Sequence, residues 1–294
     1  MTSVVAWRAR ETLTFGKGPA SVMLQDIWLA ADSLITAPIS GASRATLTGA
    51  AAKIIPIPVR LYQGYENGPG YHPIYEGQLG FAFAGSTFSA TMTQSLVMSC
   101  LGSLCGEVDD ALPTMDDMAA FICRVGTRYI TDSAAPFEAC VIGADCDRRG
   151  LAQTRCFHLT YDPKILGMVA TEVDLDPPGA FVLLGDRKAD VSKLIMSGFA
   201  ANAEYSPSQA LAQTISDSGY PSIGGALQLG RANRGWFKLL PTWGSAVPYR
   251  RSHQLWASVQ MAAWATSDRS SSGIPDYNWC SLISEPASCR EGRG

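Results

Sequence analysis

The chain has 294 residues, of which 47% are hydrophobic, enough to bury a large core and to exclude a mostly disordered protein. Its formal net charge is −3 and it has no dense run of Lys and Arg, which excludes the electrostatic footprint of a nucleic-acid binder. No apolar stretch approaches the roughly 18 residues that a membrane-spanning helix needs.

The first part of the chain is predicted to consist of strands. Residues 3–9 are rich in β-forming side chains and predict a strand that begins almost at the chain end. Residues 21–36 predict two strands joined by a turn at positions 25–26, packed as a hairpin or meander. Residues 53–57 predict a short strand, in which Pro56 indicates a sheet edge or an early end.

A segment rich in tyrosine, histidine, glycine and proline comes next. Residues 61–77, centred on a Gly-Pro-Gly sequence at positions 68–70, predict a long excursion between strands. Residues 78–84 then alternate in hydrophobicity, which predicts a half-buried strand with Leu79 and two phenylalanines on one face.

Two pairs of helices are predicted. Apolar side chains at every third or fourth position between Phe88 and Leu104 form one stripe of an amphipathic helix. Thr114 begins a second helix as the first residue of a capping box. Further on, Asp190 is predicted to cap a third helix, and Pro207 stands at the first position of a fourth, where its missing N–H costs little.

The remaining strands are predicted over residues 137–144, 154–161, 180–184 and 223–230. Strands and helices therefore come in groups, which is typical of an α+β fold rather than a doubly wound sheet. From Arg234 onward the composition changes, because five of the seven tryptophans lie between positions 236 and 279. We interpret residues 234–294 as a Trp-rich extension wrapped on the domain or on a neighbour, not as an independent domain.

Common motifs for metal, phosphate and serine-hydrolase chemistry are absent from the sequence. The cysteines and histidines form no paired zinc spacing, and neither a P-loop nor a Gly-x-Ser-x-Gly elbow occurs, so no metal or cofactor is predicted. Arg8, Arg10 and Glu11 interrupt the N-terminal segment too early for a signal peptide. We therefore expect a soluble, cytoplasmic protein with reduced thiols and without a membrane or nucleic-acid partner.

Four short motifs occur in an order that resembles a known family. They are Ile27-Trp-Leu-Ala-Ala-Asp-Ser-Leu-Ile-Thr36, Ala52-Lys53-Ile54, Phe81-Ala-Phe-Ala-Gly85-Ser and Ser222-Ile-Gly-Gly-Ala-Leu-Gln-Leu. Through these motifs, residues 2–233 resemble proteasome β subunits and related bacterial proteins such as Anbu, within the N-terminal nucleophile (Ntn) hydrolases. The resemblance implies a four-layer αββα sandwich of two stacked, mainly antiparallel sheets, and self-assembly into a homo-oligomeric ring.

Three residues can supply the chemistry of such an enzyme. A threonine hydroxyl needs a base to take its proton before it can act as a nucleophile. Removal of Met1 makes Thr2 the first residue, and an α-amine, whose ordinary pKa is about 7.7–8.0, can serve as that base. A lysine near the amine lowers its pKa, and a carboxylate paired with the lysine holds it in place. Thr2, Lys53 and Asp32 match these roles.

The resemblance assigns four further site residues. It implies that the backbone N–H of Gly85 stabilises the oxyanion, and that Thr36 pairs with the substrate backbone at a strand edge. It also implies that Ser222 and an aspartate orient the N-terminal amine. Asp217 is the match for this aspartate, although its spacing to Ser222 is longer than in the family.

The predicted activity is that of a threonine-type endopeptidase or amidohydrolase, which cleaves peptide or other amide bonds through an acyl-enzyme on Thr2. Two alternatives stay open: a non-catalytic proteasome-like structural subunit, and a small-molecule amidase of the same fold. Residues 10–20 and 61–77 lengthen the family pattern and leave the substrate size open, and no unfoldase partner is identified. The charged fraction of 17%, against about 25% in an average domain, indicates weakly charged contacts between subunits, with the extension after Arg234 as the joining segment.

Overall fold

Two β-sheets form the centre of the protein in a computed structural model of the chain. The structure describes residues 2–14, 21–38, 44–64, 71–106, 112–146, 153–202, 205–217, 219–233 and 236–240. All of these residues belong to one compact unit, Met1–Thr242. Most of the predicted extension 234–294 therefore lies outside the described residues.

The five-stranded sheet is antiparallel throughout and carries the N-terminal strand near its middle. Its strands, in spatial order, are β11 (Phe181–Gly185), β1 (Ser3–Thr14), β2 (Ser21–Ala31), β12 (Gln228–Asn233) and β13 (Trp236–Leu240). The register pairs Ser3 with Gly185 on one side of β1 and Val4 with Ala31 on the other. The start of the chain is thus held between two neighbouring strands.

The six-stranded sheet is antiparallel except where the short β7 pairs with β5. Its strands, in spatial order, are β10 (Gly167–Glu172), β9 (Thr154–Asp162), β8 (Phe137–Ala144), β6 (Tyr71–Gly85), β5 (Ile54–Gly64) and β7 (Leu104–Gly106). A separate two-stranded ribbon consists of β3 (Ile35–Pro38) and β4 (Arg44–Thr48).

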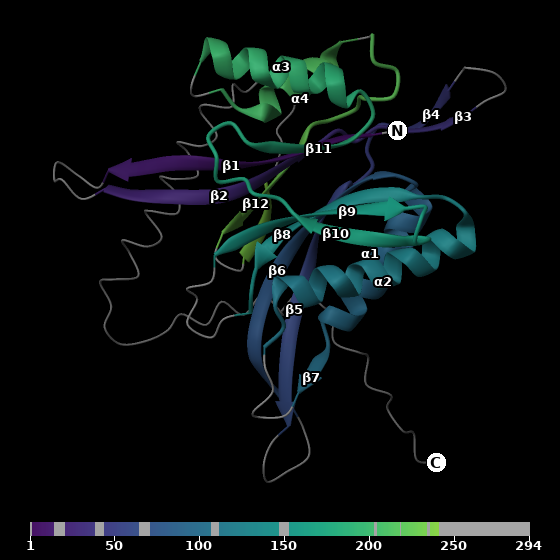
Figure 1. Cartoon of the computed structure of the whole chain (residues 1–294), viewed down its shortest axis with the longest axis vertical. Helices are drawn as coiled ribbons and strands as arrows, with labels where there is room; N and C mark the ends of the chain where they lie inside the picture. The colour runs from purple at the N-terminus through teal and green to yellow at the C-terminus, as the bar shows by residue number, and fades with distance from the viewer. Residues whose placement is uncertain are drawn as a thin grey trace, which may run out of the picture. The chain divides into compact units, whose positions relative to one another are not determined.

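Each large sheet is contacted by two helices (Figure 1). The helices α1 (Thr87–Leu101) and α2 (Met115–Ser133) contact the six-stranded sheet, whereas α3 (Lys188–Ala201) and α4 (Pro207–Ser216) contact the five-stranded sheet. The described residues therefore form a mixed α+β fold with antiparallel sheets and four helices, which confirms the predicted class at this level. None of these helices combines the length and the apolar character that crossing a membrane requires.

Apolar side chains gather in two clusters. The first lies between the six-stranded sheet and its helices and includes Phe81 and Phe83 of β6. The second lies between the two sheets and includes Ala82 and Ala84 of β6 together with Leu29 of β2. Leu79 and the two phenylalanines share one face, as predicted over residues 78–84. The strand is not half-buried, however, because Ala82 and Ala84 on its other face are buried in the second cluster.

Several other predicted elements are confirmed. Thr114 caps α2, and its side chain and that of Asp117 form the reciprocal bonds of a capping box. Pro207 is the first residue of α4. The strands predicted over 137–144 and 154–161 coincide with β8 and β9 to within one residue.

The predicted turn at residues 25–26 was wrong, whereas of the two readings of Pro56 the sheet edge is confirmed and the early end is not. Residues 25–26 form no turn, because β2 runs through them and the Asp26 carboxylate lies 3.4 Å from the Arg231 guanidinium, which compensates its burial in the strand. Pro56 does not end its strand, since β5 continues to Gly64. It lies on an edge, because β7 pairs with β5 only from Leu61 onward and Pro56 needs no partner there.

The predicted excursion over residues 61–77 is mostly strand. Residues 61–64 complete β5 and residues 71–77 begin β6, so that the two strands form one long hairpin. Tyrosine suits a strand, and the tyrosines here outweigh the glycine and proline signal. The centre of the excursion, residues 65–70, lies outside the described residues, as does the tip of the first hairpin.

The predicted strand over residues 223–230 begins later than expected. β12 starts at Gln228, because the segment before it forms turns, and in these turns the Gly224 N–H donates to the Asp32 carboxylate at 3.2 Å.

The predicted cap of the third helix was also wrong. Arg187 precedes the first residue of α3, and Asp190 lies in the first turn, 3.5 Å from the Arg187 guanidinium.

The helix α1 presents a different face from the one that its apolar periodicity predicts. Phe88 is 63% exposed and Leu96 is 42% exposed, whereas the buried residues include the small Ser89, Ala90 and Thr93. Small side chains allow the helix backbone to approach the sheet closely. The helix also ends at Leu101, before the predicted last member of the stripe, which lies in β7.

Candidate active site

Asp32 forms the centre of a buried polar cluster at the end of β2. Its side chain is fully buried and accepts four hydrogen bonds. The Ser3 N–H donates to Oδ1 at 2.9 Å, while Oδ2 accepts from the N–H groups of Leu34 at 3.1 Å and Gly224 at 3.2 Å and from Lys53 Nζ at 3.1 Å. These four donors bind both carboxylate oxygens, which compensates for their removal from water.

Lys53 is the cationic member of the cluster and lies directly before β5. Its side chain is fully buried, and Nζ donates to the Asp32 carboxylate and to the Leu34 carbonyl. Burial lowers the pKa of Lys53, while the charge and hydrogen bond of Asp32 act in the opposite direction. An ammonium has three donors, and among the described residues two of them are used by Asp32 and Leu34, which leaves one for a group entering the site.

The backbone around Lys53 is fixed by a glutamine from another sheet. Gln228, the first residue of β12, accepts with Oε1 from the N–H groups of Lys53 at 3.0 Å and Ile54 at 3.3 Å. Its Nε2 donates to the Ala51 carbonyl. Gln228 also pairs with Ala31, the residue before Asp32, so the five-stranded sheet positions both charged partners.

Thr2 lies beside this cluster and is only 5% exposed. Its carbonyl accepts from the Asp186 N–H at 2.9 Å. The carbonyl of the next residue, Ser3, accepts from the Asp32 N–H at 3.3 Å, and the Ser3 N–H donates to the Asp32 carboxylate. Gly185 packs against the Thr2 carbonyl so closely that a Cβ there would collide with it, and its φ of +93° also favours glycine. The predicted nucleophile is therefore held from both neighbouring strands.

Ser222 lies next to the turn that holds Thr2, but its aspartate partner is Asp186 and not the predicted Asp217. Ser222 Oγ donates to Asp186 Oδ2 at 2.6 Å, and this bond lowers the pKa of Asp186. Asp217 instead accepts from the Gly219 N–H at 2.9 Å, and no hydrogen bond joins it to Ser222 within the described part of the chain. Asp186 thus occupies the place beside Ser222 and Thr2 that the sequence assigned to Asp217.

Asp186 lies outside the four family-like motifs, but its place in the sequence carries a weak signal. Asp186 is a polar residue two positions after the strand predicted over 180–184, and site residues commonly gather where strands end in loops. Asp186 is far from Ser222 in the sequence, so only the folded chain reveals the pair.

Gly85 is the last residue of β6, and Thr36 lies near the start of β3. Gly85 ends β6 with a φ of +103°, and a side chain there would collide with the backbone of Phe137. Ala84, the residue before it, lies against Gly185 and hence close to the Thr2 strand. Thr36 lies in β3, just after Asp32, next to an irregularity in the pairing with β4.

The chemistry of the cluster is that of a charge-paired lysine beside a chain end. In the described part of the chain, no group of three or more His, Cys, Asp or Glu side chains could hold a metal ion.

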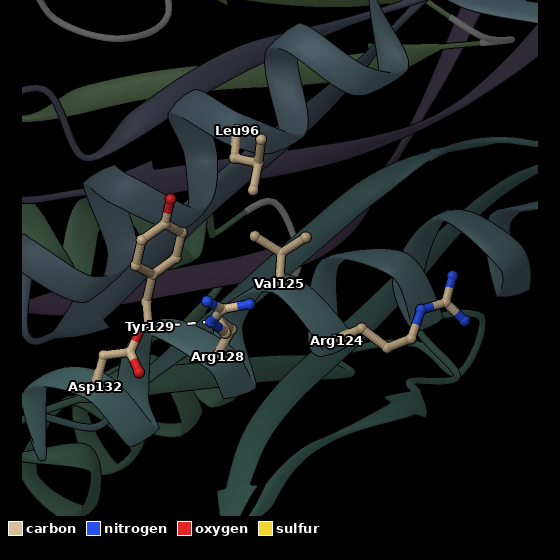
Figure 2. A pocket seen from close by; sticks show the side chains of 6 residues that line it. All are labelled: Leu96, Arg124, Val125, Arg128, Tyr129 and Asp132. Atoms are coloured by element: carbon tan, nitrogen blue, oxygen red, sulfur yellow. Dashed lines mark ion pairs between the residues drawn. The ribbon is translucent and has the colours of Figure 1, made fainter.

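A cavity of about 500 Å³ lies away from this cluster, between α1 and α2. Figure 2 shows Leu96 facing Val125 and Tyr129 there, and Arg128 paired with Asp132. None of the predicted site residues lines this cavity.

Comparison with known proteins shows a shared fold. The sequence matches no protein-family model and no curated protein. Among solved structures, the chain is similar to a Gly-1 mutant of Anbu from Hyphomicrobium sp. strain MC1, with 16% identity and a TM-score of 0.51 over 93% of this chain and 100% of that one. Another Anbu structure from the same strain gives 15% identity and a TM-score of 0.50 over 92% and 100%. A helical assembly of the Anbu complex from Pseudomonas aeruginosa gives 14% identity and a TM-score of 0.49 over 95% and 100%.

Proposed function

We propose that the protein is a threonine-type Ntn hydrolase that cleaves peptide or other amide bonds with Thr2 as its nucleophile, after removal of Met1. The observation that carries the proposal is the fully buried Asp32–Lys53 pair, whose carboxylate binds the N–H of Ser3, the residue after Thr2. A buried ion pair is costly to maintain, and a site that needs a fixed cation gives a reason for it.

The proposed reaction uses the new N-terminus as its base. The free α-amine of Thr2 takes the proton of the Thr2 hydroxyl while Oγ attacks the substrate carbonyl carbon. The amine then passes this proton to the leaving nitrogen as the amide bond breaks, which leaves an ester on Oγ. Water, activated by the same amine, hydrolyses the ester and restores the hydroxyl. The Lys53 charge favours the neutral, basic form of the amine through like-charge repulsion.

The surrounding residues supply orientation and charge stabilisation in this proposal. Ser222 and Asp186 orient the amine, a role in which Asp186 replaces the expected Asp217. The Gly85 N–H stabilises the oxyanion of the tetrahedral intermediate, and Thr36 binds the substrate backbone as an added strand. The glycine at position 85 leaves room for a substrate to approach the backbone.

The fold and assembly belong to the same proposal. The helix pair on each sheet supports a four-layer αββα sandwich, with residues 2–233 as the Ntn-hydrolase domain and 234–294 as its extension. The low charged fraction supports a homo-oligomer with weakly charged contacts, and closure into a ring is proposed from the family resemblance. We also propose a cytoplasmic location, in which the free thiols of the described cysteines would stay reduced.

Intact mass spectrometry combined with covalent labelling tests the proposed function. We expect purified protein to lack Met1, to gain one adduct from an electrophile directed at N-terminal threonine, and to hydrolyse a peptide substrate library. Thr2→Ala should abolish both labelling and hydrolysis, whereas Thr2→Ser keeps a hydroxyl and should retain part of each. Protein that keeps Met1 overturns the proposal, because the free amine then belongs to the wrong residue.

The same experiment separates the alternatives. Processed protein that is neither labelled nor active favours a non-catalytic subunit. Labelling together with hydrolysis of small amides but not of peptides favours a small-molecule amidase.

A further inference from the structure

Glu138 is a half-buried carboxylate that the proposed reaction does not use. It lies on β8, and its backbone pairs with Ala84 of β6, the residue before Gly85. Its side chain is 21% exposed and extends from the six-stranded sheet to the five-stranded sheet. Glu138 is therefore next to the strand that carries the proposed oxyanion donor while it contacts the opposite sheet.

Three donors surround the Glu138 carboxylate. The Gly185 N–H donates to Oε1 at 2.7 Å. Oε2 accepts from Lys188 Nζ at 2.8 Å and lies 3.0 Å from His158 Nε2. Burial raises the pKa of Glu138, but the bonds from His158, Lys188 and Gly185 outweigh this effect and lower it to about 2. The carboxylate is consequently charged at neutral pH, and both of its oxygens have hydrogen-bond partners.

The turn that Glu138 holds is the turn that holds Thr2. Gly185 donates to Glu138, and the next N–H, that of Asp186, donates to the Thr2 carbonyl. Asp186 also accepts the bond from Ser222. A displacement of Gly185 would therefore move the Asp186 N–H and carboxylate together, and with them both contacts to the candidate nucleophile.

We infer that Glu138 is a positioning residue, which fixes the Gly185–Asp186 turn so that Thr2 is held in register with the Gly85 strand. This inference rests on the proposed function, because it assigns Glu138 a part in the reaction of Thr2. The side-chain bonds of Glu138 in the described part of the chain go to Gly185, Lys188 and His158, so Glu138 acts on Thr2 through the Gly185 N–H. Lys188 and His158 orient its carboxylate by holding Oε2, which leaves Oε1 for the turn.

Two variants separate the role of Glu138 as a hydrogen-bond acceptor from that of its charge, and a third serves as a control. Glu138→Ala removes the acceptor of the Gly185 N–H. The double variant Glu138→Gln with Lys188→Met keeps an amide oxygen as the acceptor and removes the ammonium that would repel the amide NH₂. Glu172→Ala is the matched control, since Glu172 is a carboxylate on the same sheet whose partner is Arg155 in a surface ion pair.

The first readout is the rate of Thr2 labelling, resolved into binding and chemical steps. We expect Glu138→Ala to slow the chemical step about 10-fold or more with little change in the binding constant, because small misplacements of reacting groups are costly. The double variant and Glu172→Ala should react at close to the wild-type rate. Glu138→Ala reacting at the wild-type rate, or the double variant reacting as slowly as Glu138→Ala, overturns the inference.

The second readout is hydrogen exchange of the segment 181–187, which requires no activity. We expect faster exchange in Glu138→Ala than in wild type, the double variant or Glu172→Ala. If wild-type protein is not labelled at all, the proposed function fails, and this exchange comparison alone decides whether Glu138 holds the turn. Equal exchange in all four proteins refutes that role.

Discussion

The lysine at position 53 illustrates how a site residue can also be a stability determinant. Removal of one partner of a buried ion pair leaves the other charge uncompensated, which typically costs about 3–5 kcal/mol. We expect Lys53→Ala to lower the free energy of unfolding by this amount, measured by urea denaturation. Lys193→Ala, at an exposed position of α3, should change it by less than about 0.5 kcal/mol. Equal stability of the two variants would contradict the expected cost of leaving Asp32 without its buried partner.

Glu138 should also contribute to the pH dependence of stability. Its pKa is lowered from 4.5 to about 2 in the folded protein, so its stabilising effect is present above pH 4.5 and is lost as the pH falls towards 2. This shift corresponds to about 3 kcal/mol. Urea unfolding at pH 5 and pH 3 should show a smaller difference for Glu138→Gln than for wild type. Parallel losses in the two proteins contradict the assignment.

The candidate site could be predicted only where its residues lie in local motifs. Asp32 and Lys53 each follow or precede a strand in a characteristic short sequence, and the fold brings them to 3.1 Å. Asp186 was not predicted, because its partner Ser222 is distant in the sequence and no local motif contains both residues. Asp217 lies nearer to Ser222 along the chain, but its carboxylate closes its own turn with Gly219, a local bond that competes with any distant role.

At the scale of elements, α1 shows why apolar periodicity does not determine the buried face. Ala90 is fully buried against the sheet, and Met92, two residues on, is 37% exposed. We expect Ala90→Met to destabilise the protein by about 1–3 kcal/mol through overpacking. Met92→Ala, the matched change on the other face, should cost less than about 0.5 kcal/mol. Thermal unfolding of the two variants measures the difference, and a larger loss for Met92→Ala would reverse the assignment of the faces.

Local composition and pairing with distant strands also compete in determining which elements can be predicted from the sequence. Strands in the middle of a sheet, such as residues 137–144, are continuous in β-forming and apolar side chains and were predicted to the residue. The short β7 and the half-exposed β10 were not predicted, because they depend on pairing with a neighbour rather than on their own composition. β2 runs through Asp26 because Arg231, distant in the sequence, lies beside its carboxylate.

At the scale of the whole molecule, one aromatic side chain of β13 (Trp236–Leu240) connects the two large sheets. Phe237 of β13 is 1% exposed and packs over Gly80 of β6 and Gly230 of β12, where any side chain would collide with it. It thereby links the two sheets, although it lies beyond the boundary at residue 233 that the change in composition indicated. Phe237 is a member of the apolar cluster between the two sheets, so β13 belongs to the packed unit.

Two truncations test this boundary and the proposed role of the extension. A chain that ends at Thr242 keeps β13 and should match the full chain in thermal stability and in Thr2 labelling. A chain that ends at Asn233 loses Phe237 and should lose about 3–5 kcal/mol of unfolding free energy, as expected for removal of a buried phenylalanine. If the tryptophan-rich extension joins subunits, light scattering should find a smaller assembly for the chain ending at Thr242 than for the full chain. Equal assembly of the two would assign the weakly charged contacts to the domain itself.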